Sequence, residues 1–353
     1  MIPTLVFYAP NVHTGGGLVL LRALLASWPS GNNSGNILTA FFDSRARELL
    51  DVPPGSEITW VAASVASRLA GEIALQRMAK QKTTIVCFHG LPPLFPCAAR
   101  VLVFQQNRNY LGLNKLSQFA LKTRLRLGFE RLVSWYFRHR VSEYIVQTPS
   151  MQRNLTHWYA ASTGRAVRVR VLPFVEVFAN AVTNETVQRE WDFVYVADGV
   201  AHKNHLNLLQ AWGMLAQDNL WPALALTLSL RDAGLAQKVI QLKEQTGLRI
   251  CDLGQMPHEE VLRLYGKARA LIFPSTSESF GLPLIEASQA GLPILASELD
   301  YVRDVCIPAE TFDPHSPVSI ARAVKRFLGK PEPAVALKTP NEFWSELLQD
   351  ERP

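Results

Sequence analysis

Two glutamates, with the residues between them, form the part of the sequence best suited to chemistry. Glu278 and Glu286 are separated by seven residues within residues 271–297, LIFPSTSESFGLPLIEASQAGLPILAS. The stretch between them places free backbone N–H groups at the expected start of a helix, where oxygen-rich and anionic ligands are favoured. These amides belong to Phe280, Gly281 and Leu282. Carboxylates accept hydrogen bonds from hydroxyl groups, so the combination suits a ligand with phosphates and hydroxyls, such as a nucleotide sugar.

The same stretch predicts the elements that position these groups. An apolar run over residues 270–273 indicates a buried parallel strand, which Pro274 ends. Residues 284–290 predict a helix, and Gly291 and Pro293 close it in the usual C-terminal order. The predicted unit is therefore a strand, a polar loop, a helix and a second strand.

Taken singly, a loop glutamate and a glutamate near a helix N-terminus are ordinary features of a protein surface. Here they occur together with a Phe-Gly-Leu-Pro loop and a Gly-Leu-Pro helix stop. The stretch resembles the Glu-x7-Glu signature of retaining GT-B glycosyltransferases, particularly family four. This resemblance implies that Glu286 binds the ribose hydroxyls of a nucleotide-sugar donor. It also implies that Glu278 and the 280–282 amides bind the donor sugar.

A second predicted unit begins near residue 193 with a strand, a polar loop and a helix. In the resembling family this loop supplies an arginine and a lysine to the donor diphosphate. Lys203 falls at the lysine position, whereas Asp198 stands where the arginine is usual, and an acid repels phosphate. Lys203 and the following helix N-terminus, with His202, would then hold the diphosphate. By the same resemblance, the loop that contains Gln255 and Met256 borders the nucleotide base.

The N-terminal half also opens with a strand, a glycine loop and a helix, as doubly wound nucleotide-binding domains do. The loop contains Gly15, Gly16 and Gly17. It matches neither a dinucleotide-binding glycine motif nor a P-loop. It resembles the family's N-terminal glycine loop, which approaches the donor diphosphate and the acceptor.

Polar residues follow two further predicted strands of this half. His89 ends the strand at 84–88, and Gln106 and Asn107 follow the strand at 100–104. Ligands of parallel sheets bind outside the carboxyl ends of the strands, although such residues also serve simply to hydrogen-bond a loop. The family commonly places a histidine where this chain has Gln105, Gln106 and Asn107. An amide cannot act as a base, so either Gln106 or His89 takes the polar contact near the reacting sugar.

A basic segment over residues 115–140 has two interpretations. Its cations are Lys115, Lys122, Arg124, Arg126, Arg131, Arg138 and Arg140, against the single acid Glu130. At helical spacing, one stripe contains Lys115, Phe119, Lys122 and Arg126, and another contains Leu121, Leu125, Leu132 and Trp135. Such a helix can lie on an anionic membrane, or it can be a domain helix with a solvated basic face. No sequence motif for reading nucleic acid accompanies the charge.

Composition bounds the remaining possibilities. A chain of 353 residues with 48% hydrophobic and 19% charged residues suggests two packed domains and argues against disorder. No apolar run reaches the ~18 residues of a membrane span, and the N-terminus lacks the basic segment of a signal peptide. Four scattered cysteines predict reduced thiols in the cytoplasm. There is no zinc-like spacing and no Asp-x-Asp motif, so we expect no metal.

The sequence thus predicts an α/β protein of the GT-B type, with two Rossmann-like domains facing a cleft. We expect an acceptor-side domain over residues 1–175, a donor-binding domain over 176–330, and a segment over 331–353 that crosses back. The implied reaction is metal-independent and cofactor-free transfer of a sugar from a nucleoside diphosphate sugar to a glycan or lipid-linked hydroxyl, with retention of configuration. The expected catalytic residues are Glu278, Lys203, His89 and Gln106.

Three expectations on setting accompany this function. The resemblance places it in the assembly of bacterial surface polysaccharide or glycolipid. The protein is expected in the cytoplasm, with a peripheral position on the inner face of the plasma membrane as an option. The alternatives are an isomerase like the nucleotide-sugar 2-epimerases, which share the architecture, and a non-catalytic nucleotide-sugar-binding homologue.

Overall fold

The computed structural model describes residues 4–28, 37–112, 116, 119, 121–163, 166–176 and 189–333. Three parts of the sequence predictions lie outside these residues. They are most of the connection between the two predicted domains, the C-terminal segment from residue 334 onward, and Lys115.

The first sheet contains seven parallel strands in the order β3-β2-β1-β4-β5-β6-β7. The strands are β1 (Thr4–Ala9), β2 (Thr39–Asp43), β3 (Glu57–Val61), β4 (Thr83–Cys87), β5 (Arg100–Phe104), β6 (Glu143–Val146) and β7 (Val169–Val171). The helices around it are α1 (Gly15–Ala26), α2 (Val65–Met78), α3 (Leu121–Phe137) and α4 (Pro149–Thr163), with short turns η1 (Ser44–Leu49), η2 (Arg108–Leu111) and η4 (Arg138–Arg140). Separate buried apolar clusters lie on the two sides of the central strands, as expected of a sheet covered by helices on both faces.

The second sheet contains six parallel strands in the order β10-β9-β8-β11-β12-β13. They are β8 (Trp191–Tyr195), β9 (Leu224–Leu226), β10 (Ile250–Asp252), β11 (Ala268–Phe273), β12 (Ile294–Ser297) and β13 (Glu310–Phe312). The helices are α5 (His205–Gln217), α6 (Ala233–Thr246), α7 (His258–Gly266), α8 (Leu282–Gln289), α9 (Asp300–Arg303) and α10 (Pro317–Phe327), with turns η5 (Ala201–Lys203) and η6 (Leu230–Asp232). One continuous apolar cluster fills this unit.

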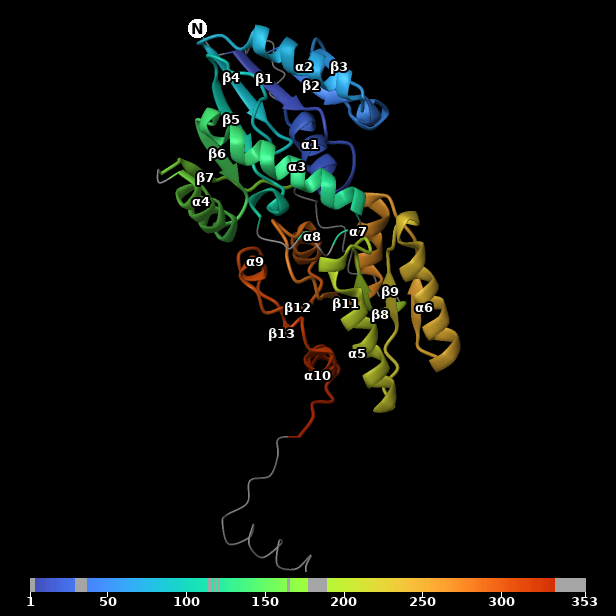
Figure 1. The fold of residues 1–353 in the computed structure, drawn as a ribbon. Coiled ribbons are helices and arrows are strands. Elements are labelled where there is room, and N and C mark those ends of the chain that lie inside the picture. The colour runs from blue at the N-terminus through green and yellow to red at the C-terminus, as the bar shows by residue number, and fades with distance from the viewer. Residues whose placement is uncertain are drawn as a thin grey trace, which may run out of the picture.

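Both sheets are doubly wound, which confirms the predicted fold class. The chain order reverses between β1 and β4 in the first sheet and between β8 and β11 in the second. Crevices for ligands form at such switch points, outside the carboxyl ends of the strands. Figure 1 shows the two sheets in separate domains, one above the other in this view, with α8 at the junction between them.

The basic segment differs from its prediction at its N-terminal end. The helix α3 begins only at Leu121 and ends at Phe137. Phe119 lies at a bend before it and packs against a small buried cluster that includes Leu91, Tyr110 and Leu127. The predicted stripe that ran through Phe119 is therefore wrong at that residue, because an aromatic side chain beside an apolar cluster is better buried than extended along a solvated helix.

His205, the first residue of α5, is a buried titratable group beneath the second sheet's switch point. It is 3% exposed and packs on the ring of Tyr195, with ring centroids 4.7 Å apart. Neither ring nitrogen has a hydrogen-bond partner among the described residues. Burial lowers the pKa of His205 to about 4, so the fold holds the neutral ring.

This burial predicts a pH-dependent stability. The unfolded chain protonates His205 near pH 6.5, whereas the folded chain resists protonation down to about pH 4. His205 therefore does not lower the free energy of unfolding above about pH 6.5. As the pH drops through this window the free energy of unfolding falls, by about 2 kcal/mol at pH 5. In thermal melts, we expect the unfolding midpoint of His205→Phe to fall less than that of the wild type when the pH is lowered from about 7.5 to 5. The exposed His315→Phe serves as the control, and equal losses in all three proteins would contradict the account.

Candidate active site

The Glu-x7-Glu loop of the second domain touches the first domain at several places. Leu282 packs against the first domain's apolar cluster, and a Cβ at Gly16 would lie 3.0 Å from its Cδ1. Thr148 Oγ1 donates to the carbonyl of Ser279 at 3.3 Å. The structure thus brings the loop after β11 to the glycine loop after β1, as the resemblance to a two-domain cleft implies.

Lys203 and Glu278 meet directly. Lys203 Nζ lies 2.6 Å from Glu278 Oε1, and the two side chains are only 15% and 11% exposed. Ser275 Oγ donates to the same carboxylate oxygen at 2.7 Å. A mostly buried, charge-assisted pair of this kind fixes both side chains in place. An anionic ligand entering here would compete with Glu278 for the ammonium group.

Backbone contacts tie the two loops of this pair together. The amide of Thr276 donates to the carbonyl of His202 at 2.8 Å, and Ser275 Oγ also reaches that carbonyl, at 3.1 Å. Tyr195 on β8 donates its hydroxyl to the carbonyl of Lys203 at 2.7 Å. The Lys203–Glu278 pair therefore rests on a hydrogen-bonded frame between the carboxyl ends of the two adjacent strands β8 and β11.

Gly281 is the residue that sets the start of α8. It has φ of 76°, and a Cβ there would lie 3.1 Å from Leu284 Cδ1, so both conformation and space favour glycine. It occupies the N-cap, and its side chain cannot cap the helix. In the first turn of α8, Pro283 has no N–H and the amide of Leu284 donates to the carbonyl of Gly281 at 2.9 Å, so the amide of Leu282 is the one left for a ligand or water.

Glu286 is more deeply buried than Glu278. It is 5% exposed, Tyr265 on α7 donates its hydroxyl to Oε2 at 3.0 Å, and His258 Nδ1 lies 3.6 Å from Oε1. Burial raises the pKa of Glu286, an effect that His258 and the Tyr265 hydroxyl oppose. Glu286 is therefore a buried carboxylate with a hydrogen-bond donor, within the helix α8. Gln255 and Met256 lie in the loop directly before His258.

The glycine loop of the first domain opens α1, which begins at Gly15 with φ of 65°. A Cβ at Gly17 would lie 3.3 Å from Gln106 Oε1. Gln106 Nε2 donates to the carbonyl of Phe88 at 2.8 Å. The structure thus brings Gln106 against the glycine loop and fixes its side-chain amide. This amide therefore lies close to the N-terminal amides of α1.

His89 occupies a different environment from Gln106. Its ring packs edge-on against Tyr8, with centroids 5.1 Å apart, and Nδ1 lies 3.2 Å from the Tyr8 carbonyl oxygen. A carbonyl can only accept, so Nδ1 carries the proton and Nε2 keeps its lone pair. Burial lowers the pKa of His89 to about 4. The ring is therefore neutral at pH 7 and can accept a hydrogen bond through Nε2.

Arg108 is a cation at the cleft that the sequence did not single out. It begins η2, just after β5, and its Nη1 donates to the carbonyl of Glu278 at 3.3 Å. Its buried Nε has no hydrogen-bond partner among the described residues. Burial lowers the pKa of Arg108, while Tyr301, Glu278 and Asp300 oppose that shift. Its position four residues beyond the end of β5, in a loop already expected at the cleft, was the available signal.

The loop after β8 is less basic than the resemblance implies. Asp198 is exposed to solvent, and the backbone amide of its neighbour Gly199 is hydrogen-bonded to Asp232. Burial lowers the pKa of His202, which favours its neutral ring. Lys203 remains as the loop's cation near Glu278.

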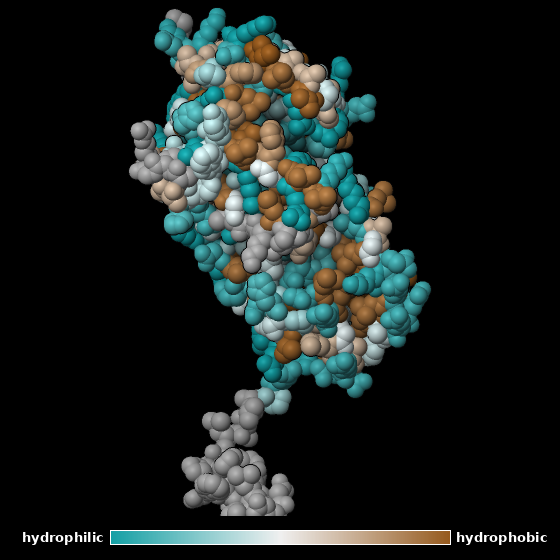
Figure 2. All heavy atoms as spheres, in the orientation of Figure 1, coloured by the Kyte–Doolittle hydropathy of each residue, from teal (hydrophilic) through white to brown (hydrophobic). Residues whose placement is uncertain are grey.

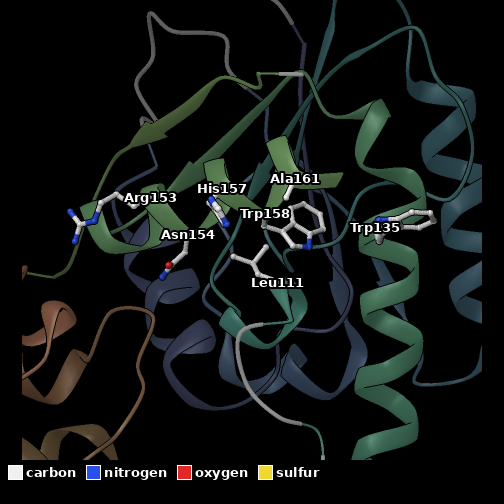
Figure 3. Close-up of a pocket in the computed structure, with 7 residues that line it drawn as sticks. All are labelled: Leu111, Trp135, Arg153, Asn154, His157, Trp158 and Ala161. Carbon is white, nitrogen blue, oxygen red and sulfur yellow. The ribbon is translucent and has the colours of Figure 1, made fainter. Parts of the chain in front are cut away.

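A cavity of about 750 Å³ lies elsewhere, in the first domain. Figure 3 shows its lining, which comes from η2, α3 and α4. The lining residues are Leu111, Trp135, Arg153, Asn154, His157, Trp158 and Ala161. None of the residues predicted for the site lines it, so the candidate site is the region around Lys203 and Glu278 where the loops of the two domains meet.

Two further structural findings concern the described residues alone. They contain no group of three or more histidine, cysteine, aspartate or glutamate side chains arranged to hold a metal ion. None of their helices combines the length and the apolar character needed to cross a bilayer.

The burial of Glu286 predicts that Tyr265 matters for stability. In Tyr265→Phe, Glu286 Oε2 keeps its buried position but loses the hydroxyl donor, and an unsatisfied buried acceptor costs about 2 kcal/mol. Urea denaturation should show this loss. Tyr144→Phe is a matched control, because the buried Tyr144 hydroxyl has no hydrogen-bond partner among the described residues. Equal destabilisation by both substitutions would contradict the anchoring role.

Comparisons with known proteins give a family match in the second half of the chain. Residues 180–341 match the family model of the glycosyl transferases group 1. The serotype-specific mannosyltransferase WbdA of Escherichia coli is 36% identical over 93 residues, which are 26% of this chain and 11% of that protein. The O-antigen chain mannosyltransferase B of Escherichia coli is 30% identical over 115 residues, or 32% of this chain and 30% of that protein. The matches therefore span less than a third of each relative.

Solved structures match almost the whole chain, at low sequence identity. The sucrose-phosphate synthase of Thermosynechococcus elongatus superposes with a TM-score of 0.67 and 18% identity, over 93% of this chain and 90% of that one. Anabaena HepE in complex with UDP-glucose gives a TM-score of 0.65 and 14% identity, over 92% and 89% of the two chains. These similarities concern the fold. The match over residues 180–341 relates the second half of the chain to the glycosyl transferases group 1 family, and the two parallel sheets give the chain the GT-B fold.

Proposed function

We propose that the protein is a retaining glycosyltransferase that moves a sugar from a nucleoside diphosphate sugar to a hydroxyl acceptor. The observation that carries this proposal is the partly buried pair of Lys203 and Glu278, 2.6 Å apart, in the loop that leads into α8. It places a cation, a carboxylate and the amide of Leu282 in one region. That set of groups suits the diphosphate and hydroxyls of a sugar nucleotide.

Charge stabilisation on the leaving diphosphate is the main task of such an enzyme. Lys203 and the N-terminal amides of α1 supply it in this proposal, with Arg108 as a second cation. Arg108 already reaches the carbonyl of Glu278 from the first domain. It would compensate for Asp198, whose exposure lets solvent screen its repulsion of phosphate.

Donor binding changes the partner of Lys203 in this scheme. The diphosphate takes the place of the Glu278 carboxylate at the ammonium group, and Glu278 turns its oxygens to the sugar hydroxyls. Glu286 receives the ribose hydroxyls through Oε1, since Tyr265 already holds Oε2. Gln255 and Met256, next to His258, would border the base.

The chemical step needs no covalent bond to the protein. The bond from the sugar to the diphosphate oxygen breaks, and a bond from the acceptor oxygen forms on the same face of the ring. The acceptor proton passes to the leaving phosphate oxygen. Gln106 and the neutral His89 orient the acceptor by hydrogen bonds, and Glu278 does not act as a hydrolase nucleophile.

The relatives support a hexose donor and a polysaccharide or glycolipid acceptor. Two of them are named mannosyltransferases, one acting on O-antigen chains, and one solved neighbour holds UDP-glucose. The division of labour would follow the predicted domains, with acceptor binding by residues 1–175, donor binding by 176–330, and 331–353 crossing back. A cytoplasmic setting, where sugar nucleotides are made, fits this role.

Donor binding is the first test. Thermal unfolding should be followed with UDP-, GDP-, ADP- and dTDP-sugars, because a ligand of the folded state raises the midpoint by mass action. We expect one nucleotide to raise it in the wild type, and the shift to shrink in Glu286→Ala and Arg108→Ala. The exposed Lys238→Ala should behave as the wild type. Undiminished shifts in both site variants would contradict the site.

Transfer and its stereochemistry form the second test. With the bound donor and a panel of glycan and glycolipid acceptors, NMR should show the product linkage with the donor's anomeric configuration. Lys203→Met should slow turnover about 100-fold through lost charge stabilisation, in protein whose folding is verified by its melting curve. An inverted product, or donor isomerisation that needs no acceptor, would refute the proposed reaction.

A further inference from the structure

Helix α3 carries a stripe of large apolar side chains that faces solvent. They are 46% to 69% exposed, and Figure 2 shows hydrophobic surface gathered over this helix. The residues are Leu121, Leu125, Phe129, Leu132, Trp135 and Tyr136. At about 100° per residue they fall within an arc of roughly 120°, so they form one continuous face over the whole helix.

The opposite side of α3 is the one that packs on the domain. Leu127, Val133 and Ser134 are buried there, and Arg131 Nε donates to the carbonyl of Asn109 at 2.6 Å. A domain helix ordinarily turns its apolar stripe inward. In α3 the cations and the apolar stripe both face solvent while another side packs on the domain, so a solvated basic face alone does not account for this surface. A contiguous exposed apolar face marks an interaction surface.

Cations border the stripe along both edges. By helical position, Lys122 and Arg126 lie on one side, where Arg126 also pairs with Glu130 at 3.9 Å, and Arg124 lies on the other. The single acid of α3, Glu130, lies on the packed side, where it is 15% exposed. The exposed face of α3 therefore combines apolar side chains, aromatic residues at its C-terminal end and positive charge, without an acid.

We propose that α3 docks on an anionic lipid surface, with its apolar stripe in the boundary between headgroups and acyl chains. An in-plane amphipathic helix uses apolar burial together with attraction between lysine or arginine and anionic headgroups. Tryptophan and tyrosine favour the same boundary. A second copy of the chain is the poorer occupant, because a two-fold contact of this face would oppose like charges along both edges.

The docking also bears on the candidate site. Arg131 on α3 holds the backbone of η2, and η2 begins with Arg108, which touches the Glu278 loop. A docked α3 would thus hold the cleft near the lipid surface. On the proposed function, this favours an acceptor whose hydroxyl is presented by a glycolipid.

Vesicle flotation tests the docking without any enzyme assay. The probe is phosphatidylcholine vesicles with and without about 30% phosphatidylglycerol, at low and high salt. We expect the wild type to bind the anionic vesicles at least tenfold more strongly than the neutral ones. Leu125→Glu with Phe129→Glu should reduce this binding at least tenfold, and Lys122→Glu with Arg124→Glu should reduce it and weaken its salt dependence.

Two comparisons keep the test decisive. Ile240→Glu with Val318→Glu changes exposed apolar residues of α6 and α10 and should bind vesicles as the wild type does. Melting curves and donor-induced shifts of the α3 variants should be unchanged, which separates a docking failure from a failure of the active site. The proposal is overturned if the α3 variants bind anionic vesicles as strongly as the wild type, or if the wild type does not bind them. It is also overturned if the protein forms a dimer without lipid and Leu125→Glu dissociates that dimer.

Discussion

The arrangement at the cleft depends on one buried ion pair, between Lys203 and Glu278. The two residues follow adjacent strands, β8 and β11, at the point where the second sheet changes direction. Each charge lies in a poorly solvated position and compensates the other, so neither is tolerated there alone. A diphosphate is a natural replacement for the carboxylate at the ammonium group. The same pair that holds the two loops together therefore also prepares them for an anionic donor.

The residues around this pair are held in place in different ways. Beneath it, Glu286 is anchored by Tyr265 in the second domain's apolar core. Across from it, the first domain contributes Arg108 and the glycine loop, which contacts Leu282. Farther out, α3 packs one face on the first domain and leaves the other to solvent. The donor side is thus held by a packed core, whereas the first domain reaches it through loops.

Local patterns were enough to predict the strands, the glycine loops and the helix after Gly281, because apolar runs and helix stops are properties of neighbouring residues. The meeting of Lys203 and Glu278, 75 positions apart, followed only from resemblance to a family. Arg108 was missed because nothing in its neighbours shows that η2 turns it toward the other domain. The apolar stripe of α3 was visible in the sequence, but only packing shows that it faces solvent while Leu127, Val133 and Ser134 face the domain. Phe119 was placed on that helix wrongly, because its packing against Leu91, Tyr110 and Leu127 is not visible in its neighbours.

The most direct test of the site is a crystal structure with the nucleoside diphosphate sugar that stabilises the protein most. The account predicts that the diphosphate lies within hydrogen-bonding distance of Lys203 and Arg108, with Glu278 released to the sugar and Glu286 on the ribose. A nucleotide bound elsewhere, such as the cavity beside Trp158, with the Lys203–Glu278 pair intact, would contradict it.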